Sequence, residues 1–188
     1  MALREIKIFP DPALRKTAEP VTAFDEALRN LVNDMIETMV AHSGVGLAAP
    51  QVGVSQRVII IDAGPEDGDE DDEGEDRRRM LILVNPEIAE EEGELTWNEG
   101  CLSFPGIYED INRASRVVVN ACDIDGVNIM VEGEGLLAVA LQHEIDHLDG
   151  ALIFDYMSYI RKKLVKRELK KKVEQMKKET EDSSQGLV

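Results

Sequence analysis

The chain has 188 residues, 43% of them hydrophobic, and no internal repeat, which predicts a single domain with an ordinary core. The N-terminus lacks the apolar run of a secretory signal and no stretch approaches membrane-spanning length, so we expect a cytoplasmic protein without a membrane partner. The net charge of -17 is uneven: residues 66–76 carry nine acids and no base, whereas residues 161–178 carry ten bases and two acids. Solvated surface is the default interpretation of both charge runs, and we expect no DNA partner.

The cysteine content limits covalent cross-linking. Cys101 and Cys122 are the only cysteines, so the chain can form one disulfide at most. A reducing compartment favours free thiols instead, and a thiolate is then available to a metal ion.

The first half of the chain predicts one helix and two strands. Apolar residues recur at helical spacing over residues 24–40, which indicates an amphipathic helix. Thr22, followed three residues later by Asp25, is its expected cap, and Gly44 its stop, which leaves His42 as a polar residue near the helix end. Beyond it we predict a glycine-bounded loop at residues 44–53 and two strands at residues 58–61 and 80–84. A long acidic surface loop, residues 64–79, separates the two strands.

The second half predicts a hairpin and two helices. Asp125-Gly126 suits a tight turn between strands 117–122 and 127–131. Residues 135–149 form a helix that is apolar on all sides and ends at Gly150, and a lysine-rich helix covers residues 158–178, with the last eight residues fraying. The fold class is therefore α+β: mostly antiparallel strands around one buried helix, with an N-terminal amphipathic helix and a C-terminal helix.

The buried helix carries the most informative motif, His143-Glu-Ile-Asp-His147. Residues four apart in a helix lie on one face, so both imidazoles can bind one ion, and Glu144 is then within reach of a metal-bound water as a base. The alternative is a solvated surface bearing two histidines and several acids. The apolar flanks argue against that alternative, because buried ionisable groups need compensating partners.

Two histidines cannot hold a catalytic metal alone, so a third ligand is required. One group of zinc proteases adds a third histidine after this motif, but that position here is Ile153. Another group uses a later glutamate, yet Glu168 lies among lysines and arginines, where a solvated ion pair is the simpler role. Cys101 is the remaining soft donor, and its place between Gly100 and a turn suits a thiolate at a backbone bend.

Three motifs, taken together, resemble those of the bacterial-type peptide deformylases. They are GVGLAAPQ at residues 44–51, EGCLS at residues 99–103 and QHEIDH at residues 142–147, and they occur in that family's order. The resemblance covers about residues 1–160 as a catalytic domain, and residues 161–188 form a basic C-terminal helix and frayed tail of the same domain. It implies an α+β fold with antiparallel sheets enclosing a central metal-bearing helix. The implied function is removal of the N-terminal formyl group from formylmethionyl nascent polypeptides, with release of formate.

The resemblance also implies a role for individual residues. Cys101, His143 and His147 would hold one divalent metal, most commonly ferrous iron, with zinc, nickel or cobalt as possible occupants. Glu144 would be the base, and the Gln51 side-chain amide and Leu102 backbone N–H would stabilise the oxyanion. The expected substrate-binding residues are Val45, Gly46, Trp97, Glu99, Gly100, Leu136, Val139 and Ala140. The last three precede His143 at helical spacing, which would place an apolar wall for methionine beside the ion.

Several further expectations concern the surroundings of the site. Asp146 or Glu99 would orient the ligands or the loop, and Arg113 would pair with Glu99. The long acidic loop and Phe104 depart from the family pattern without touching its motifs. The basic C-terminal helix is a candidate for contact with ribosomal RNA.

Two rival functions share the metal site. A metallopeptidase would cleave unformylated peptides, and a binding module would keep the metal as a structural clip with four protein ligands. Glu144 and Gln51 count against the second, because a structural site needs neither a base nor an oxyanion donor.

Overall fold

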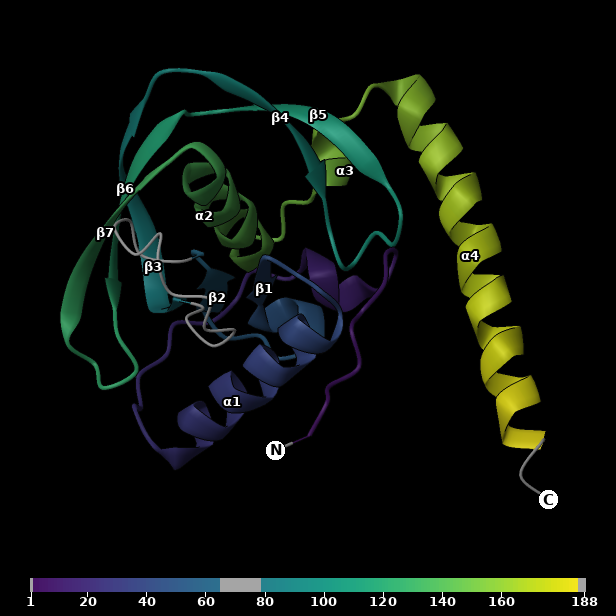
Figure 1. The fold of residues 1–188 in the computed structure, drawn as a ribbon, viewed down its shortest axis with the longest axis horizontal. Coiled ribbons are helices and arrows are strands. Elements are labelled where there is room, and N and C mark those ends of the chain that lie inside the picture. Colours follow the sequence, from purple (N-terminus) through teal and green to yellow (C-terminus); the bar gives the residue numbers. More distant parts are fainter. Residues whose placement is uncertain (1, 65–78, 186–188) are drawn as a thin grey trace, which may run out of the picture.

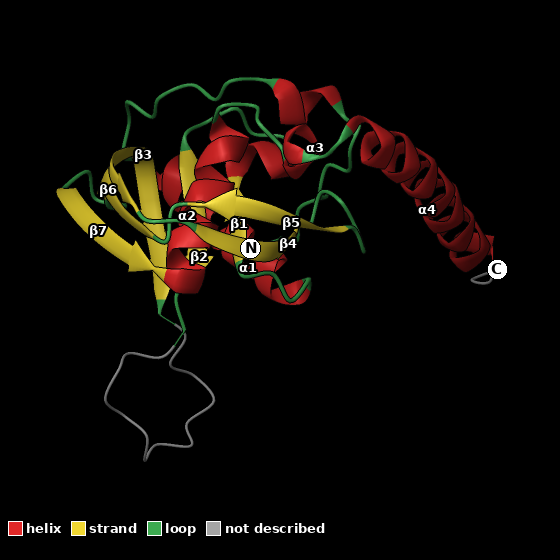
Figure 2. Ribbon diagram, turned by 90° about the horizontal axis from the view of Figure 1, so that it is seen from above, coloured by secondary structure: helices red, strands yellow, loops and turns green. Residues whose placement is uncertain are grey.

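The computed structural model describes residues 2–64 and 79–185 and has an α+β architecture with two antiparallel sheets (Figures 1 and 2). The larger sheet has the order β1-β2-β3-β6-β7, and the smaller one is the hairpin β4-β5. The strands are β1 (Gly46–Ala48), β2 (Val58–Asp62), β3 (Met80–Glu92), β4 (Leu95–Gly100), β5 (Tyr108–Arg113), β6 (Arg116–Cys122) and β7 (Asn128–Glu134). The helices are α1 (Glu26–Ala41), α2 (Gly135–Leu148), α3 (Ile153–Tyr156) and α4 (Tyr159–Gln185).

Helix α1 confirms the predicted amphipathic helix but not its predicted cap. Asp25 is the N-cap, and its side chain accepts a hydrogen bond from the backbone N–H of Leu28, so the assignment to Thr22 is wrong. An N-cap is a short polar residue directly before the first helical turn. Asp25 occupies that position, whereas Thr22 lies three residues further from the helix. At the other end His42 is the C-cap, and its Nδ1 lies 2.8 Å from the carbonyl oxygen of Thr38.

The strands extend the prediction in three places. β1 lies within the segment expected to be a loop, β3 continues to Glu92 instead of ending at residue 84, and the hairpin β4-β5 was not predicted. β3 is long because it pairs first with β2 and then, across two register shifts, with β6. Its second half is rich in glutamate, so hydrophobic alternation could not reveal it. Residues 65–78, most of the predicted acidic loop, lie outside the described residues.

Helix α2 lies between the large sheet and the β4-β5 hairpin (Figure 1). Its limits agree with the predicted helix to within one residue, and ten of its fourteen residues are buried. β7 approaches it closely at Gly133, where a side chain would collide with Leu137 and Leu141. The result is a rigid element buried against several strands, which suits a helix that must fix functional side chains.

Helix α4 runs along the outside of the molecule (Figure 1). Val165 and Leu169 are buried in one apolar cluster with Leu14 and Phe104, and the Nζ of Lys172 donates to the carbonyl oxygen of Pro105. The helix continues to Gln185, seven residues beyond its predicted end at residue 178, and residues 186–188 lie outside the described part of the chain. None of the helices in the described residues combines the length and apolar character needed to cross a membrane.

Candidate active site and metal centre

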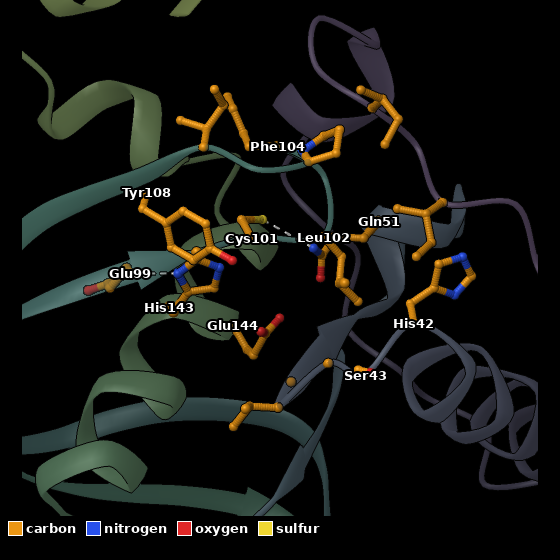
Figure 3. Close-up of a pocket in the computed structure, with 18 of the residues that line it drawn as sticks. His42, Ser43, Gln51, Glu99, Cys101, Leu102, Phe104, Tyr108, His143 and Glu144 are labelled. Atoms are coloured by element: carbon orange, nitrogen blue, oxygen red, sulfur yellow. Dashed lines mark hydrogen bonds and ion pairs between the residues drawn. The ribbon is translucent and has the colours of Figure 1, made fainter. Parts of the chain in front are cut away.

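A pocket of about 1160 Å³ opens between α2, β1 and the β4-β5 hairpin (Figure 3). All eight residues predicted to bind substrate line it, together with Gln51, Cys101, Leu102, His143 and Glu144. Leu136, Val139 and Ala140 form its α2 side, as their helical spacing predicted, and Val45 with Gly46 forms the β1 side. The structure therefore brings three distant motifs into one cavity.

Three potential metal ligands converge at this pocket. One donor atom from each of Cys101, His143 and His147 lies within 4.8 Å of the others, and the Sγ of Cys101 is 3.2 Å from the Nε2 of His147. Helix α2 places both imidazoles on one face, and Cys101 directly follows the last residue of β4. A thiolate and two imidazoles are a donor set typical of zinc, iron and related divalent ions, so the residues present fit a resident metal.

A buried ion-pair network holds the first histidine. The Nδ1–H of His143 donates to Glu99 at 2.8 Å, and Arg113 donates to both oxygens of Glu99 at 2.7 and 3.0 Å. Arg113 also donates to Asp146 at 2.7 Å. The predicted pairing of Arg113 with Glu99 is thus confirmed. Because Nδ1 is engaged, the opposite ring nitrogen of His143 is left for the metal.

The network determines the charges of its members. Burial raises the pKa of Glu99, but the hydrogen bonds from His143 and Arg113 outweigh it and keep the pKa below its usual range. Burial also lowers the pKa of His143, yet contacts with Cys101 and Glu99 bring it well above normal. The anionic groups Cys101 and Glu99 that raise this pKa would equally attract a metal cation, which would compete with the proton for the imidazole of His143. Burial and the neighbouring His143 depress the pKa of His147, which keeps that imidazole neutral and able to act as a ligand.

Among the buried side-chain nitrogen and oxygen atoms of the described residues, two have no hydrogen-bond partner: Glu144 Oε2 and His147 Nδ1. Such atoms are costly to bury and are rare outside functional sites. Burial raises the pKa of Glu144 to about 7, so this carboxyl can exchange a proton near neutral pH. Figure 3 shows its side chain directed into the pocket beside His143. Glu144 thus has the position and proton affinity of a general base.

Gln51 faces the same ligands from a 3-10 helix, Ala49–Val52. Its Oε1 accepts the backbone N–H of Ala48 at 2.7 Å, which fixes the orientation of the amide. The amide nitrogen then donates toward Cys101 Sγ at 3.5 Å and Ser103 Oγ at 3.3 Å. A side-chain donor is therefore held in advance beside the metal ligands.

Gly46 lies directly against the side chain of Glu144, so close approach of a peptide substrate is not the only reason for a glycine here. A Cβ at this position would lie 2.5 Å from Glu144 Oε1 and 2.9 Å from its Cδ. The missing side chain thus leaves the space that the Glu144 carboxylate occupies. The spacing of the glycines in the sequence does not reveal this contact.

Three residues near the site were not singled out from the sequence. Ser103 accepts from Gln51, Tyr108 lines the pocket beside Gly100, and Tyr156 closes the outer side of the Arg113 network. Ser103 is the last residue of the EGCLS motif, so the motif could have indicated it. Tyr108 and Tyr156 carry no local signal, because their positions follow from how the hairpin and α3 pack.

Comparison with known proteins decides the family. A sequence model described as polypeptide deformylase matches residues 3–164. The chain belongs to the peptide deformylase family. It is 48% identical over 175 residues to the peptide deformylase of Alkalilimnicola ehrlichii, covering 93% of each chain. It is also 45% identical over 172 residues to that of Thermodesulfovibrio yellowstonii, covering 92% of this chain and 99% of the relative.

Solved structures agree with the family assignment. The peptide deformylase of Legionella pneumophila superposes with a TM-score of 0.84 at 44% identity and covers 93% of this chain and 98% of its own. That of Ehrlichia chaffeensis in complex with actinonin gives 0.83 at 37% identity, covering 92% and 98%. Enzymes of this family are metal-dependent and remove the N-formyl group from nascent polypeptides. Deformylation is accordingly the function of this chain, and both rival functions are set aside.

Proposed function

We propose that this chain hydrolyses N-formylmethionyl peptides with Glu144 as general base beside a divalent metal held by Cys101, His143 and His147. The observation that carries the proposal is the convergence of those three donor atoms within 4.8 Å at the wall of a pocket that Glu144 also lines. The ion, when bound, would supply Lewis-acid activation of the attacking water.

The protein's own groups account for the proton transfers and the charge. Glu144 accepts a proton from water as the oxygen attacks the formyl carbon, and it then donates that proton to the departing amine as the C–N bond breaks. The Gln51 amide and the Leu102 backbone N–H hold the negative charge of the tetrahedral intermediate. Formate and a peptide with a free N-terminal amine are the products. A pKa near 7 suits a group that acts first as base and then as acid.

The substrate side of the pocket supports a methionine preference. Leu136, Val139 and Ala140 present an apolar wall, and Trp97 adds an aromatic surface that is 38% exposed. A flexible thioether side chain fits such a wall. The peptide backbone would extend past Val45 and Gly46 on one side and Glu99 and Gly100 on the other, where strand ends offer hydrogen-bonding groups.

Formate release from a formyl-Met peptide by anaerobically purified protein tests the proposal. Glu144→Ala should lower kcat by roughly 10²- to 10⁴-fold while metal content stays at the wild-type level. Glu168→Ala is the matched control, since that acid pairs with Arg161 on the surface and should leave kcat unchanged. Full activity of Glu144→Ala at full metal occupancy would contradict the assigned base.

The resident metal is proposed to be ferrous iron, with zinc, nickel or cobalt able to substitute. Elemental analysis of protein purified without oxygen should find one equivalent of iron. Because Cys101 is only partly buried, both thiolate and iron are accessible to oxidants, and aerobic handling should reduce activity. Actinonin, bound in the Ehrlichia chaffeensis structure, is the proposed ligand for confirming an intact pocket.

The C-terminal helix is proposed to belong to the same domain as residues 1–160 and to contact the ribosome in the cytoplasm. Burial of Val165 and Leu169 in the main body supports the first part. Exposed Arg167, Lys170 and Lys171 support the second, since phosphate contacts need accessible cations. Replacing these three residues by alanine should reduce co-sedimentation with ribosomes at low salt and leave kcat on a free peptide unchanged. Unchanged sedimentation would remove the ribosome proposal.

A further inference from the structure

Tyr156, on α3, forms the outer end of the buried ion-pair network. Its hydroxyl donates to Asp146 at 2.8 Å and accepts from Arg113 at 3.1 Å. Its ring lies over the same guanidinium, with 4.8 Å between Arg113 Cζ and the ring centroid. One side chain therefore contacts Arg113 through both a hydrogen bond and a cation–π interaction.

The groups behind Tyr156 are almost fully buried. The Arg113 and Glu99 side chains are 4% and 2% exposed, whereas Asp146 is 24% exposed and Tyr156 as a whole is 47% exposed. Tyr156 therefore lies between solvent and the ion pair. Charged groups in such a place keep a single geometry only when every donor has a fixed partner.

The position of Tyr156 is itself fixed from outside the site. Its neighbours Ile153 and Phe154 are buried, and Asp155 accepts hydrogen bonds from Arg15 and from the backbone N–H of Leu152, each at 2.9 Å. Burial and the adjacent Asp146 together raise the pKa of Tyr156 to about 12, so the hydroxyl keeps its proton and remains a donor.

We propose that Tyr156 is a positioning residue that fixes Arg113, and through Arg113 and Glu99 the ring of His143. The chain of contacts is continuous: Tyr156 to Arg113, Arg113 to Glu99, and Glu99 to His143. A histidine whose second nitrogen is held in this way binds metal more tightly, because its tautomer and ring orientation are set before the ion arrives. The inference rests on the proposed metal site.

The test compares tyrosine variants loaded with Co²⁺ alone. Tyr156→Phe keeps the ring and removes the hydroxyl, and Tyr156→Leu removes both contacts. We expect Co²⁺ to dissociate into excess chelator about 3- to 10-fold faster from Tyr156→Phe, less than the roughly 10- to 100-fold typical of a direct ligand partner. Tyr156→Leu should release it faster still, and the Co²⁺ absorption bands should shift in both.

Tyr159 provides the matched control. It is 72% exposed and stacks with Lys163, with 4.6 Å from Nζ to the ring centroid, but it lies outside the network. Tyr159→Phe and Tyr159→Leu should leave the dissociation rate and spectrum unchanged. In a Glu99→Gln background the relay is already broken, so adding Tyr156→Phe should produce no further change in dissociation.

The outcomes separate this inference from the proposed function. A wild-type chain that binds no Co²⁺ at Cys101, His143 and His147 would overturn both. Wild-type Co²⁺ binding with unchanged dissociation in both Tyr156 variants would overturn only the positioning role, even if their melting temperatures fell. An undiminished effect of Tyr156→Phe in the Glu99→Gln background would also overturn it, because the route through Glu99 would then be wrong.

Discussion

Helix α2 and the β4-β5 hairpin contribute to the site in different ways. The helix supplies His143, Glu144 and His147 through its own period, whereas the hairpin supplies Glu99, Cys101 and Arg113 only after it has curved over the helix. Both regions bury ionisable side chains, but those of α2 are placed by one helical period, whereas Glu99 and Arg113 of the hairpin pair with each other across two strands. One half of the centre is thus encoded locally, and the other half depends on charges that pair after folding.

Breaking the hairpin half at Arg113 should have the largest effect on stability. Arg113→Ala leaves Glu99 buried without its ion-pair partner, and removing one member of a buried pair typically costs about 3–5 kcal/mol. We expect the melting temperature and the denaturant midpoint to fall together. Metal content should also fall, because Glu99 orients His143.

Arg116→Ala is the control for this prediction. Arg116 contacts three glutamates, Glu90, Glu92 and Glu132, but on the surface, with its side chain 26% exposed. Solvent screens such pairs, so this variant should unfold at nearly the wild-type denaturant concentration. Equal losses for Arg113→Ala and Arg116→Ala would show that burial of the hairpin charges does not matter.

A substitution at Gly46, on β1, should disturb the part of the site that α2 supplies, because Gly46 lies against Glu144. Gly46→Ala places a methyl group where the Glu144 carboxylate lies, and a displacement of about 1 Å in a catalytic group can cost on the order of 100-fold in rate. We expect kcat and the melting temperature to fall while metal content is retained, measured by formate release, thermal unfolding and elemental analysis.

A double variant isolates the cause of the Gly46 effect. In a Glu144→Ala background the added methyl group has room, so Gly46→Ala should no longer lower the melting temperature. If the loss of stability is the same with and without the Glu144 carboxylate, the steric explanation is wrong.

The difference between the two regions also explains what the sequence could predict. The interval between His143 and His147 is a helical turn, so spacing alone placed both rings on one face. The hairpin offers no comparable signal. Arg113 is paired in register with Leu95, and Leu95 is four residues before Glu99 on the same strand. The ion pair between Arg113 and Glu99 therefore depends on how the hairpin curves. The exclusion of Ile153 and Glu168 indicated Cys101 as the third ligand, and the motif resemblance supplied the role of Gln51.

Some features had no sequence signal at all. The second half of β3 alternates poorly because it is rich in glutamate and pairs with β6 through two register shifts. Tyr156 reaches the site because α3 packs against β5 of the hairpin. The sequence of a four-residue helix does not indicate which strand it will contact. Packing between elements distant in sequence decides these positions, and no local pattern encodes it.

The pH dependence of kcat/KM sharpens the assignment of Glu144. The base acts in its deprotonated form, and burial raises its pKa to about 7, so activity should fall about tenfold per pH unit below the midpoint. A bound cation lowers the pKa of a neighbouring carboxyl, which places the midpoint of the metal-loaded enzyme at or below that value. The absence of any acid limb over the whole pH range in which the metal content, measured in the same samples, stays constant would contradict the assignment.

The smallest predicted effect concerns a purely local feature, the cap of α1. Asp25→Ala removes the acceptor for the Leu28 N–H and should lower the free energy of unfolding by about 1 kcal/mol. Thr22→Ala, the position that sequence alone favoured, should have no measurable effect on the denaturant midpoint. The reverse result would restore the sequence-based assignment. Because neither residue lines the pocket, kcat should be unchanged in both, so local capping would be separable from the cross-element contacts that build the site.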